Sequence, residues 1–213
     1  MTDTANTPET KRAWPPRGEL DALLHPAIQA HDLDTVLLAV RAYAERTPPP
    51  GRRLYRPQPG LDSNALAEPL AEQLAPEYNT SWFHMLLYNA GNACLRAGAT
   101  QLALEVYKQA LMGFLHPGVY VNISAIMDLQ GRRQEAMRWL KRAIDVDPNY
   151  SQAYLNAAAL ATMYEFPGED PVAYLEQYRE MGGTTEEALV FLQACDDSER
   201  PTLEAVFRRT IPL

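Results

Sequence analysis

Two stretches of the chain carry one pattern and decide the fold: YNAGNACLRAGATQLALEVYKQALMGFLHP (88–117) and VNISAIMDLQGRRQEAMRWLKRAIDVDPNY (121–150). Small residues occupy equivalent positions in the two stretches, and each pair is separated by the same number of residues: Gly98 and Gly131, Ala103 and Ala136, Ala110 and Ala143. Apolar residues recur at intervals of three and four, which is the period of an amphipathic helix. Each stretch therefore predicts a helix, a short glycine turn and a second helix, and Pro117 and Pro148 punctuate the ends.

The small residues have a physical purpose, because two antiparallel helices approach closely only where the facing side chains are small. The residues expected at this contact are Gly91, Ala103 and Ala110 in the first unit, and Ser124, Ala136 and Ala143 in the second. Tyr107 and Leu140 are expected to fill the remaining space. A set repeated at one spacing is a stronger signal than any of its members.

At these residues the chain resembles the tetratricopeptide repeat (TPR) family, whose units have about 34 residues, small residues at fixed places and a terminal proline. DVDPNY (145–150) followed by SQAYLNAAA (151–159) resembles the boundary between two such units. The resemblance implies repeats near 84–116, 117–150 and 151–181. We therefore expect an all-α protein, an α-solenoid of about three TPR-like helix-turn-helix repeats with flanking helices.

The sequence outside the repeats predicts how the chain is organised. Residues 18–48 resemble a degenerate TPR-like helix pair, and SNALAEPLAEQLA (63–75) predicts a short helix. The C-terminal stretch predicts two amphipathic capping helices, the first with Thr185 as N-cap. The predicted segments are a disordered tail (1–17), an N-terminal helix pair (18–48), a Pro-rich strap or loose linker (49–63), the solenoid (64–181) and the capping helices (182–213).

Composition limits the classes of function and location. The net charge is −8, of which residues 149–213 contribute −7 through 11 acidic and 4 basic side chains. A chain without a broad basic face is not expected to bind nucleic acid. Two distant cysteines, Cys94 and Cys195, suit a reducing compartment. The N-terminus lacks an apolar signal segment and the longest uncharged run, 109–127, contains a turn, so we expect a cytoplasmic protein with no membrane insertion.

Asparagines recur at one place in the first helices of the three units: Asn89, Asn122 and Asn156. A primary amide both donates and accepts, so it can bond both groups of one peptide unit. The TPR resemblance implies that such aligned asparagines bind a peptide backbone in the concave groove. The groove residues expected to bind are Tyr88, Asn89, Asn92, Arg96, Val121, Asn122, Asp128, Gln152, Leu155, Asn156 and Met163. The alternative is that the asparagines join neighbouring repeats.

No motif of catalysis is present, since GxSxG, HExxH, GxGxxG and Walker-type loops are all missing. We expect no enzyme activity, cofactor or metal site. The second helix of the middle repeat is basic and predicts either a solvated face or a dock for an acidic partner: Arg132, Arg133, Arg138, Lys141 and Arg142.

The expected function is a protein-protein interaction module, an adaptor, scaffold or chaperone-like protein, that binds a peptide or partner protein in the groove. The alternative is a constitutive structural subunit or assembly factor of a larger complex. The sequence leaves the partner and the oligomeric state open.

Overall fold

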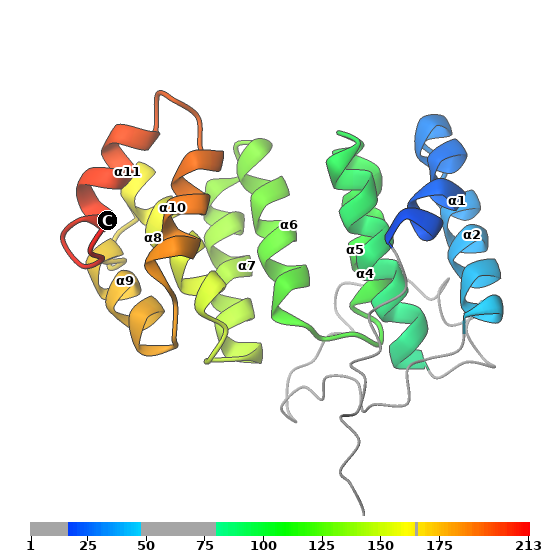
Figure 1. The fold of residues 1–213 in the computed structure, drawn as a ribbon, viewed down its shortest axis with the longest axis horizontal. Helices are drawn as coiled ribbons and strands as arrows, with labels where there is room; N and C mark the ends of the chain where they lie inside the picture. Colours follow the sequence, from blue (N-terminus) through cyan, green and yellow to red (C-terminus); the bar gives the residue numbers. More distant parts are fainter. Residues whose placement is uncertain (1–16, 48–79, 165) are drawn as a thin grey trace, which may run out of the picture.

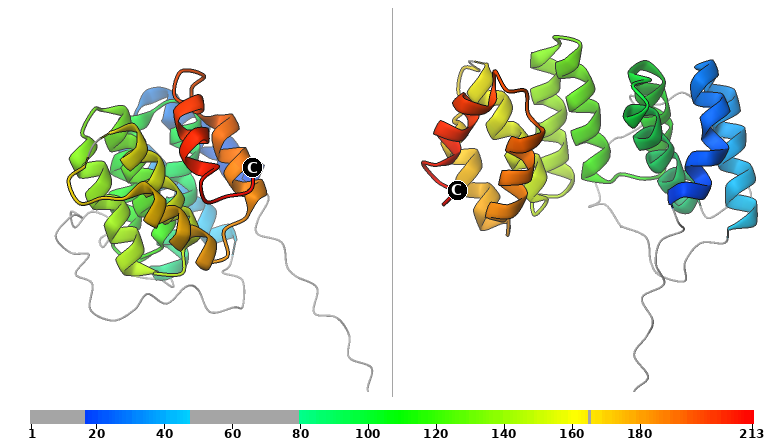
Figure 2. Two further views of the ribbon diagram at one scale, coloured as in Figure 1. Left: turned by 90° about the vertical axis from the view of Figure 1, so that its left-hand side faces the viewer. Right: turned by 45° about the horizontal axis from the view of Figure 1, so that its top comes forward.

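A computed structural model describes residues 17–47, 80–164 and 166–213, and within these ranges every regular element is a helix. The helices lie side by side in one elongated array that begins with α1 and α2 and ends with α11 (Figures 1 and 2). They are α1 (Arg17–Ala30), α2 (Leu33–Arg46), α4 (Thr80–Arg96), α5 (Thr100–Ala110), α6 (Pro117–Leu129), α7 (Arg133–Val146), α8 (Ser151–Met163), α9 (Pro171–Glu180), α10 (Thr185–Ala194) and α11 (Arg200–Phe207). The chain is thus an all-α solenoid, as predicted. The predicted tail, strap and 63–75 helix fall almost entirely outside the described residues.

The turns inside the two clearest repeats have the same geometry. Gly98 and Gly131 have φ angles of 76° and 73°, a left-handed conformation that side chains other than glycine rarely adopt. In each turn the residue after the glycine donates to a carbonyl of the preceding helix: Ala99 N to Cys94 O at 3.0 Å, and Arg132 N to Met127 O at 2.8 Å. This is the helix-ending bond of the Schellman motif. The constant interval in the sequence therefore corresponds to a repeated turn in the structure.

The α1–α2 turn is closed by the same kind of bond, Asp32 N to Ala27 O at 3.1 Å, although it contains no glycine. His31 takes the left-handed conformation there, with φ 52°. Asp32 then caps α2 by accepting a hydrogen bond from Asp34 N at 3.1 Å. The N-terminal helix pair thus has a repeat-like turn that the sequence pattern does not predict.

The small residues predicted at the helix contacts are all buried, and Tyr107 and Leu140 are 0% and 1% exposed beside them. The contact is tightest at Gly91, because a Cβ atom added there would lie 2.5 Å from Tyr107 Cε1. That separation is far shorter than a van der Waals contact, so the aromatic ring of α5 occupies the space that a side chain on α4 would need. The glycine is therefore required by its neighbour rather than by its own backbone angles.

The C-terminal helices form a second apolar cluster with the third repeat. Ala188 and Leu192 of α10 and Leu203 and Phe207 of α11 are buried together with Leu155 of α8. Helix α10 has Thr184 as its N-cap, one position earlier than the predicted Thr185, because Thr184 and Glu187 form a reciprocal capping box. Within the described ranges, no helix is long and apolar enough to cross a membrane.

Replacing Gly91 with alanine is expected to lower the free energy of unfolding by about 1–3 kcal/mol, because the new methyl group overlaps the Tyr107 ring. Chemical denaturation followed by circular dichroism measures this change. Gly18→Ala is the matched control, since a Cβ at Gly18 meets nothing within 4 Å in helix α1. Equal stability of the two variants would contradict the packing that we describe.

Candidate functional site on the concave face

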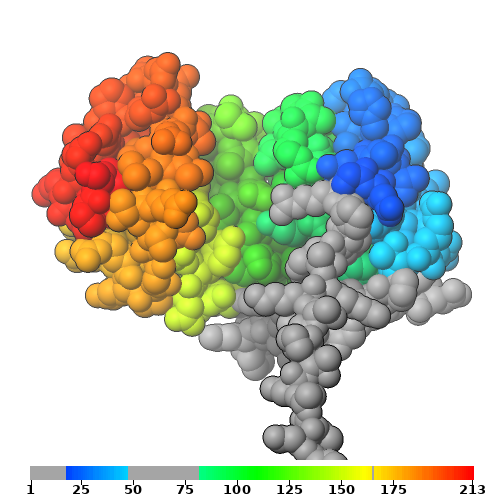
Figure 3. Space-filling view, in the orientation of Figure 1, coloured from blue at the N-terminus to red at the C-terminus, as the bar shows by residue number. Residues whose placement is uncertain are grey.

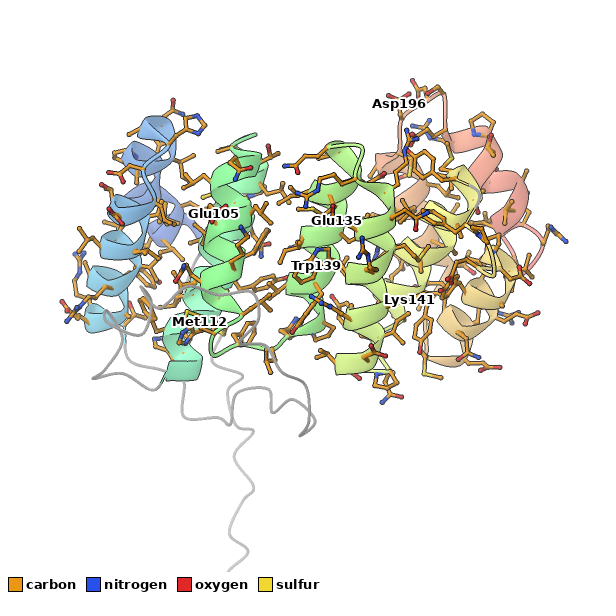
Figure 4. The ribbon with its side chains drawn as sticks, turned by 180° about the vertical axis from the view of Figure 1, so that it is seen from behind. Glu105, Met112, Glu135, Trp139, Lys141 and Asp196 are labelled. Atoms are coloured by element: carbon orange, nitrogen blue, oxygen red, sulfur yellow. The ribbon has the colours of Figure 1, made fainter. Side chains whose placement is uncertain are left out.

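The second helices of the repeats form one face of the molecule. Seen from behind, Glu105 lies on α5 and Trp139 and Lys141 lie on α7 (Figure 4). On the opposite face, the centre of the array is set back between the C-terminal helices at one end and α1 at the other (Figure 3). The predicted groove residues belong to α4, α6 and α8, the first helices of the three repeats.

The asparagines of the first two repeats meet at a polar junction. Tyr107 Oη donates to Asn92 Oδ1 at 2.7 Å, and Asn122 Nδ2 donates to the same oxygen at 2.7 Å. The distance from Asn122 Nδ2 to Tyr107 Oη is 3.1 Å. These three side chains come from α4, α5 and α6, so the junction joins the first repeat to the second. Burial raises the pKa of the Tyr107 hydroxyl, which therefore stays protonated and able to donate.

The junction leaves part of its hydrogen-bonding capacity unused. Asn92 Nδ2 and Asn122 Oδ1 form no hydrogen bond with the described residues, and both side chains are only half-buried. A donor group and an acceptor from successive repeats therefore remain for another molecule. One atom of each amide therefore helps to join the two repeats, and the other atom remains open for binding.

A cleft of about 140 Å³ lies between α4 and the N-terminal helix pair. Four of the predicted site residues line it together: Tyr88, Asn89, Asn92 and Arg96. Asn89 is half-buried, and its amide forms no hydrogen bond with the described residues. Because no described residue bonds this amide, both its oxygen and its nitrogen are available to a ligand.

The other wall of this cleft comes from α1 and α2. Asp21 forms a two-pronged ion pair with Arg96, with Arg96 Nη2 at 3.1 and 3.0 Å from the two carboxylate oxygens. Tyr43 also lines the cleft; it is 3% exposed, and its hydroxyl has no hydrogen-bond partner among the described residues. A buried hydroxyl without a partner is costly, so a polar group entering here would satisfy it.

The third repeat does not continue the asparagine arrangement. Asn156 Nδ2 donates to Gln152 O of its own helix at 2.8 Å. The residues of the second repeat that correspond to Asn92 and Tyr107 are Ala125 and Leu140, which cannot hydrogen-bond through their side chains. Asn156 thus lacks the partners that hold Asn122, and it turns to its own backbone.

Two groove predictions are wrong about exposure. Leu155 is 0% exposed because it belongs to the second apolar cluster, which includes residues of α9, α10 and α11. Val121 is 8% exposed because it belongs to the main core. Neither side chain is therefore open to a ligand in the groove. Gln152 and Asn156 remain half-buried.

Asp128 and Met163 lie near the C-terminal ends of α6 and α8. Burial raises the pKa of the Asp128 carboxyl, and Arg133 and Tyr164 oppose that rise. Met163 and Tyr164 line a recess with the start of α7. The predicted site residues therefore separate into the cleft, the junction, the third repeat and this edge.

An aromatic cluster supports the junction beside the start of α6. The ring of Tyr88 lies 5.8 Å from those of Phe114 and His116, and the Phe114 and His116 rings stack at 5.3 Å. His116 is also the N-cap of α6, because its Nδ1 accepts from Gly118 N at 3.0 Å. Burial lowers the pKa of His116. The neutral imidazole is the form that fits, since a protonated Nδ1 could not accept that hydrogen bond.

Repeats of equal length, left-handed glycine turns and small residues at each helix contact are now established for α4 to α7. The described repeats are tetratricopeptide-like. No model of a protein family matches the chain, and a comparison with curated proteins finds no relative. Among solved structures the chain is similar to YrrB, described as a TPR protein with an unusual peptide-binding site, with 13% identity, coverage of 96% of this chain and 89% of that one, and a TM-score of 0.47.

Two crystal structures of MamA are also similar to this TPR-like chain. The first has 14% identity, coverage of 87% of this chain and 90% of that one, and a TM-score of 0.45. The second has 14% identity, coverage of 84% and 97%, and a TM-score of 0.41.

Within the residues that the structure describes, no group of three or more His, Cys, Asp or Glu side chains could hold a metal ion.

Sequence reasoning did not find Asp21 and Tyr43, because the match of α1 and α2 to a repeat is weak. A signal was present at Tyr107, where a tyrosine occupies a buried position that phenylalanine would fill equally well. A buried tyrosine hydroxyl normally has a partner, so the residue type itself pointed to a polar group beside it.

Tyr107→Phe is expected to reduce the free energy of unfolding by about 1–2 kcal/mol, because it removes the hydroxyl shared by Asn92 and Asn122 inside a half-buried junction. Urea denaturation provides the measurement. Tyr88→Phe is the matched control, since the Tyr88 hydroxyl forms no hydrogen bond with the described residues. A loss in Tyr88→Phe as large as in Tyr107→Phe would disprove the role of the junction.

Acidification is expected to destabilise the protein through His116. Its pKa is below the ordinary 6.5 in the folded state, so the unfolded chain binds a proton first as the pH falls from about 7 to about 5. The stabilisation is thus present at a pH above the ordinary pKa and is lost below it. In His116→Asn, which keeps a capping side chain without a titrating group, the unfolding free energy should depend less steeply on pH. Identical slopes would exclude His116 as the cause.

Proposed function

We propose that this chain is a protein-interaction module that binds an extended peptide segment of a partner protein at the α1–α4 cleft and across the neighbouring junction. The observation that carries the proposal is the Asn89 amide, which is unbonded among the described residues and lines the cleft beside Tyr88, Asn92 and Arg96. A peptide unit offers one donor and one acceptor, and a single primary amide satisfies both.

The junction extends this surface by one repeat. Asn92 Nδ2 and Asn122 Oδ1 offer a further donor and acceptor along the direction from α4 to α6. Both amides are fixed by the bonds to Tyr107, so little conformational entropy is lost when a peptide binds them. The Tyr43 hydroxyl adds a buried polar group at the wall of the cleft.

The recognition is mainly of the peptide backbone, because the available groups are amides rather than a dense set of charges. Arg96 is already paired with Asp21, so its charge is largely compensated. The proposal therefore concerns an adaptor or scaffold role and includes no reaction.

Asn89→Ala is expected to weaken peptide binding about fivefold or more, which corresponds to about 1 kcal/mol for a lost pair of amide bonds. Peptides selected from a random display library on the wild-type protein would be titrated calorimetrically against each variant. The unfolding free energy should be unchanged, since Asn89 bonds no described residue.

Asn156→Ala is the matched control, because its amide donates within its own helix and lies outside the cleft. Peptides that bind Asn89→Ala as tightly as wild type would refute the cleft as the site. Asn122→Ala is unsuitable as a first test, because it breaks the junction between repeats as well as a binding group.

A further inference from the structure

A second candidate surface lies where the α6–α7 turn meets the end of α8. It is an open recess of about 660 Å³, which we call the edge recess. Its lining residues are Gly131, Arg132, Arg133, Gln134, Glu135, Arg138, Met163, Tyr164 and Phe166. These residues lie outside the α1–α4 cleft, and Glu135 marks their position near the start of α7 in Figure 4.

The floor of the edge recess is apolar and aromatic. Phe166 is 8% exposed, and its ring meets that of Tyr164 edge-on at 6.5 Å. Met163 is half-buried beside them. A methionine next to aromatic rings forms an adaptable surface that accepts another apolar or aromatic side chain. The recess can therefore hold a large apolar group.

The rim of the recess is basic, but its arginines differ in their partners. Arg132 is neutralised by a two-pronged pair with Glu135, at 2.8 and 2.6 Å. The Arg133 guanidinium lies over the Tyr164 ring, 3.9 Å from its centroid, and Asp128 attracts it electrostatically. Arg138 is exposed and donates to Gln134 O at 3.3 Å. Glu135 attracts it electrostatically, but no described carboxylate lies within ion-pair distance of it.

The positive charge continues from the recess along α7. Arg142 follows Arg138 by four residues and therefore lies on the same side of the helix. Its guanidinium lies 4.9 Å from the centre of the Trp139 ring, and no described carboxylate pairs with it. Lys141 on the same helix is compensated by Glu169. Among the described residues of this surface, the cations without an ion pair are thus arginines, two of them placed over aromatic rings.

Stacked arginines suit one class of ligand in particular. A guanidinium that lies over a ring can still direct N–H groups outward, where a carboxylate can accept two of them. The whole chain carries a net charge of −8, so this patch is a local exception on an acidic protein. Complementary charge favours an acidic partner, and the apolar floor favours one with an aromatic side chain.

We propose that the edge recess and the adjoining face of α7 form a second docking surface, which binds an acidic peptide segment carrying an aromatic residue. The aromatic side chain enters the recess over Met163 and Phe166. The carboxylates on either side of it pair with Arg133 and Arg138. This surface is separate from the cleft, so the two can be tested independently.

The test uses a fluorescein-labelled synthetic peptide with one phenylalanine flanked by aspartates and glutamates, measured by fluorescence anisotropy with the full chain. Arg138→Glu is expected to weaken its binding about tenfold or more. Arg209→Glu is the matched control, because Arg209 is exposed, lies beyond α11 and undergoes the same change of charge. It should leave the affinity within about twofold of wild type. Both variants alter exposed side chains, and circular dichroism would verify their folding.

Four further titrations complete the design. Replacing the phenylalanine by alanine in the peptide should weaken binding, and Asn89→Ala in the protein should not. A peptide with lysines in place of the acidic residues should not bind below about 1 mM. The proposal is overturned if Arg138→Glu and Arg209→Glu bind the acidic peptide equally, or if an oligothymidylate of equal charge binds as tightly as the peptide. It is also overturned if the wild type self-associates through this face and Arg138→Glu is monomeric, because a second copy is then the occupant.

Discussion

The contact between Tyr107 and Gly91 is the constraint on which the rest of the structure depends. The ring of α5 lies so close to α4 that only a glycine fits, and the same ring carries the hydroxyl that organises Asn92 and Asn122. One side chain therefore fixes the spacing inside the first repeat and the connection to the second. Because its hydroxyl accepts and donates within the group, neither asparagine can rotate without losing a bond.

This dependence on Tyr107 explains why the equivalent residues Asn89, Asn122 and Asn156 have three different surroundings. Asn122 reaches back to a carbonyl and a hydroxyl in the preceding repeat, whereas Asn156 would reach back to Ala125 and Leu140. Asn89 precedes both and faces the N-terminal helix pair instead. The contacts of a residue in a solenoid thus depend on its own position and on the residues one repeat earlier. Equivalent positions become equivalent sites only where those earlier residues also recur.

The sequence predicted the repeats because their requirements are local. Glycine adopts a left-handed turn most readily, which explains Gly98 and Gly131. Close helix contact favours small residues such as Ala103 and Ala136. The surface could be predicted only in part. The helical period placed Tyr88, Asn89, Asn92 and Arg96 on one side of α4, and the structure brings them into one cleft. The helical period could not reveal that Leu155 is buried, because the apolar cluster around it includes residues of α9, α10 and α11 from later in the chain. Asp21 and Tyr43 were missed for the same reason, since their place in the cleft depends on how a distant helix pair docks.

In the peptide site that we propose, the burial of Leu155 in the second apolar cluster limits the length of a ligand that follows the asparagines. The asparagine amides of the cleft and the junction lie on α4 and α6, with α1 as the far wall of the cleft, and neighbouring helices lie about 10 Å apart. The accessible track is then about 20 Å long, which an extended chain crosses with about six residues. A short linear motif fits such a footprint, whereas a long segment wound along a superhelix does not. In the peptide site that we propose, the bound segment thus ends where the second apolar cluster begins.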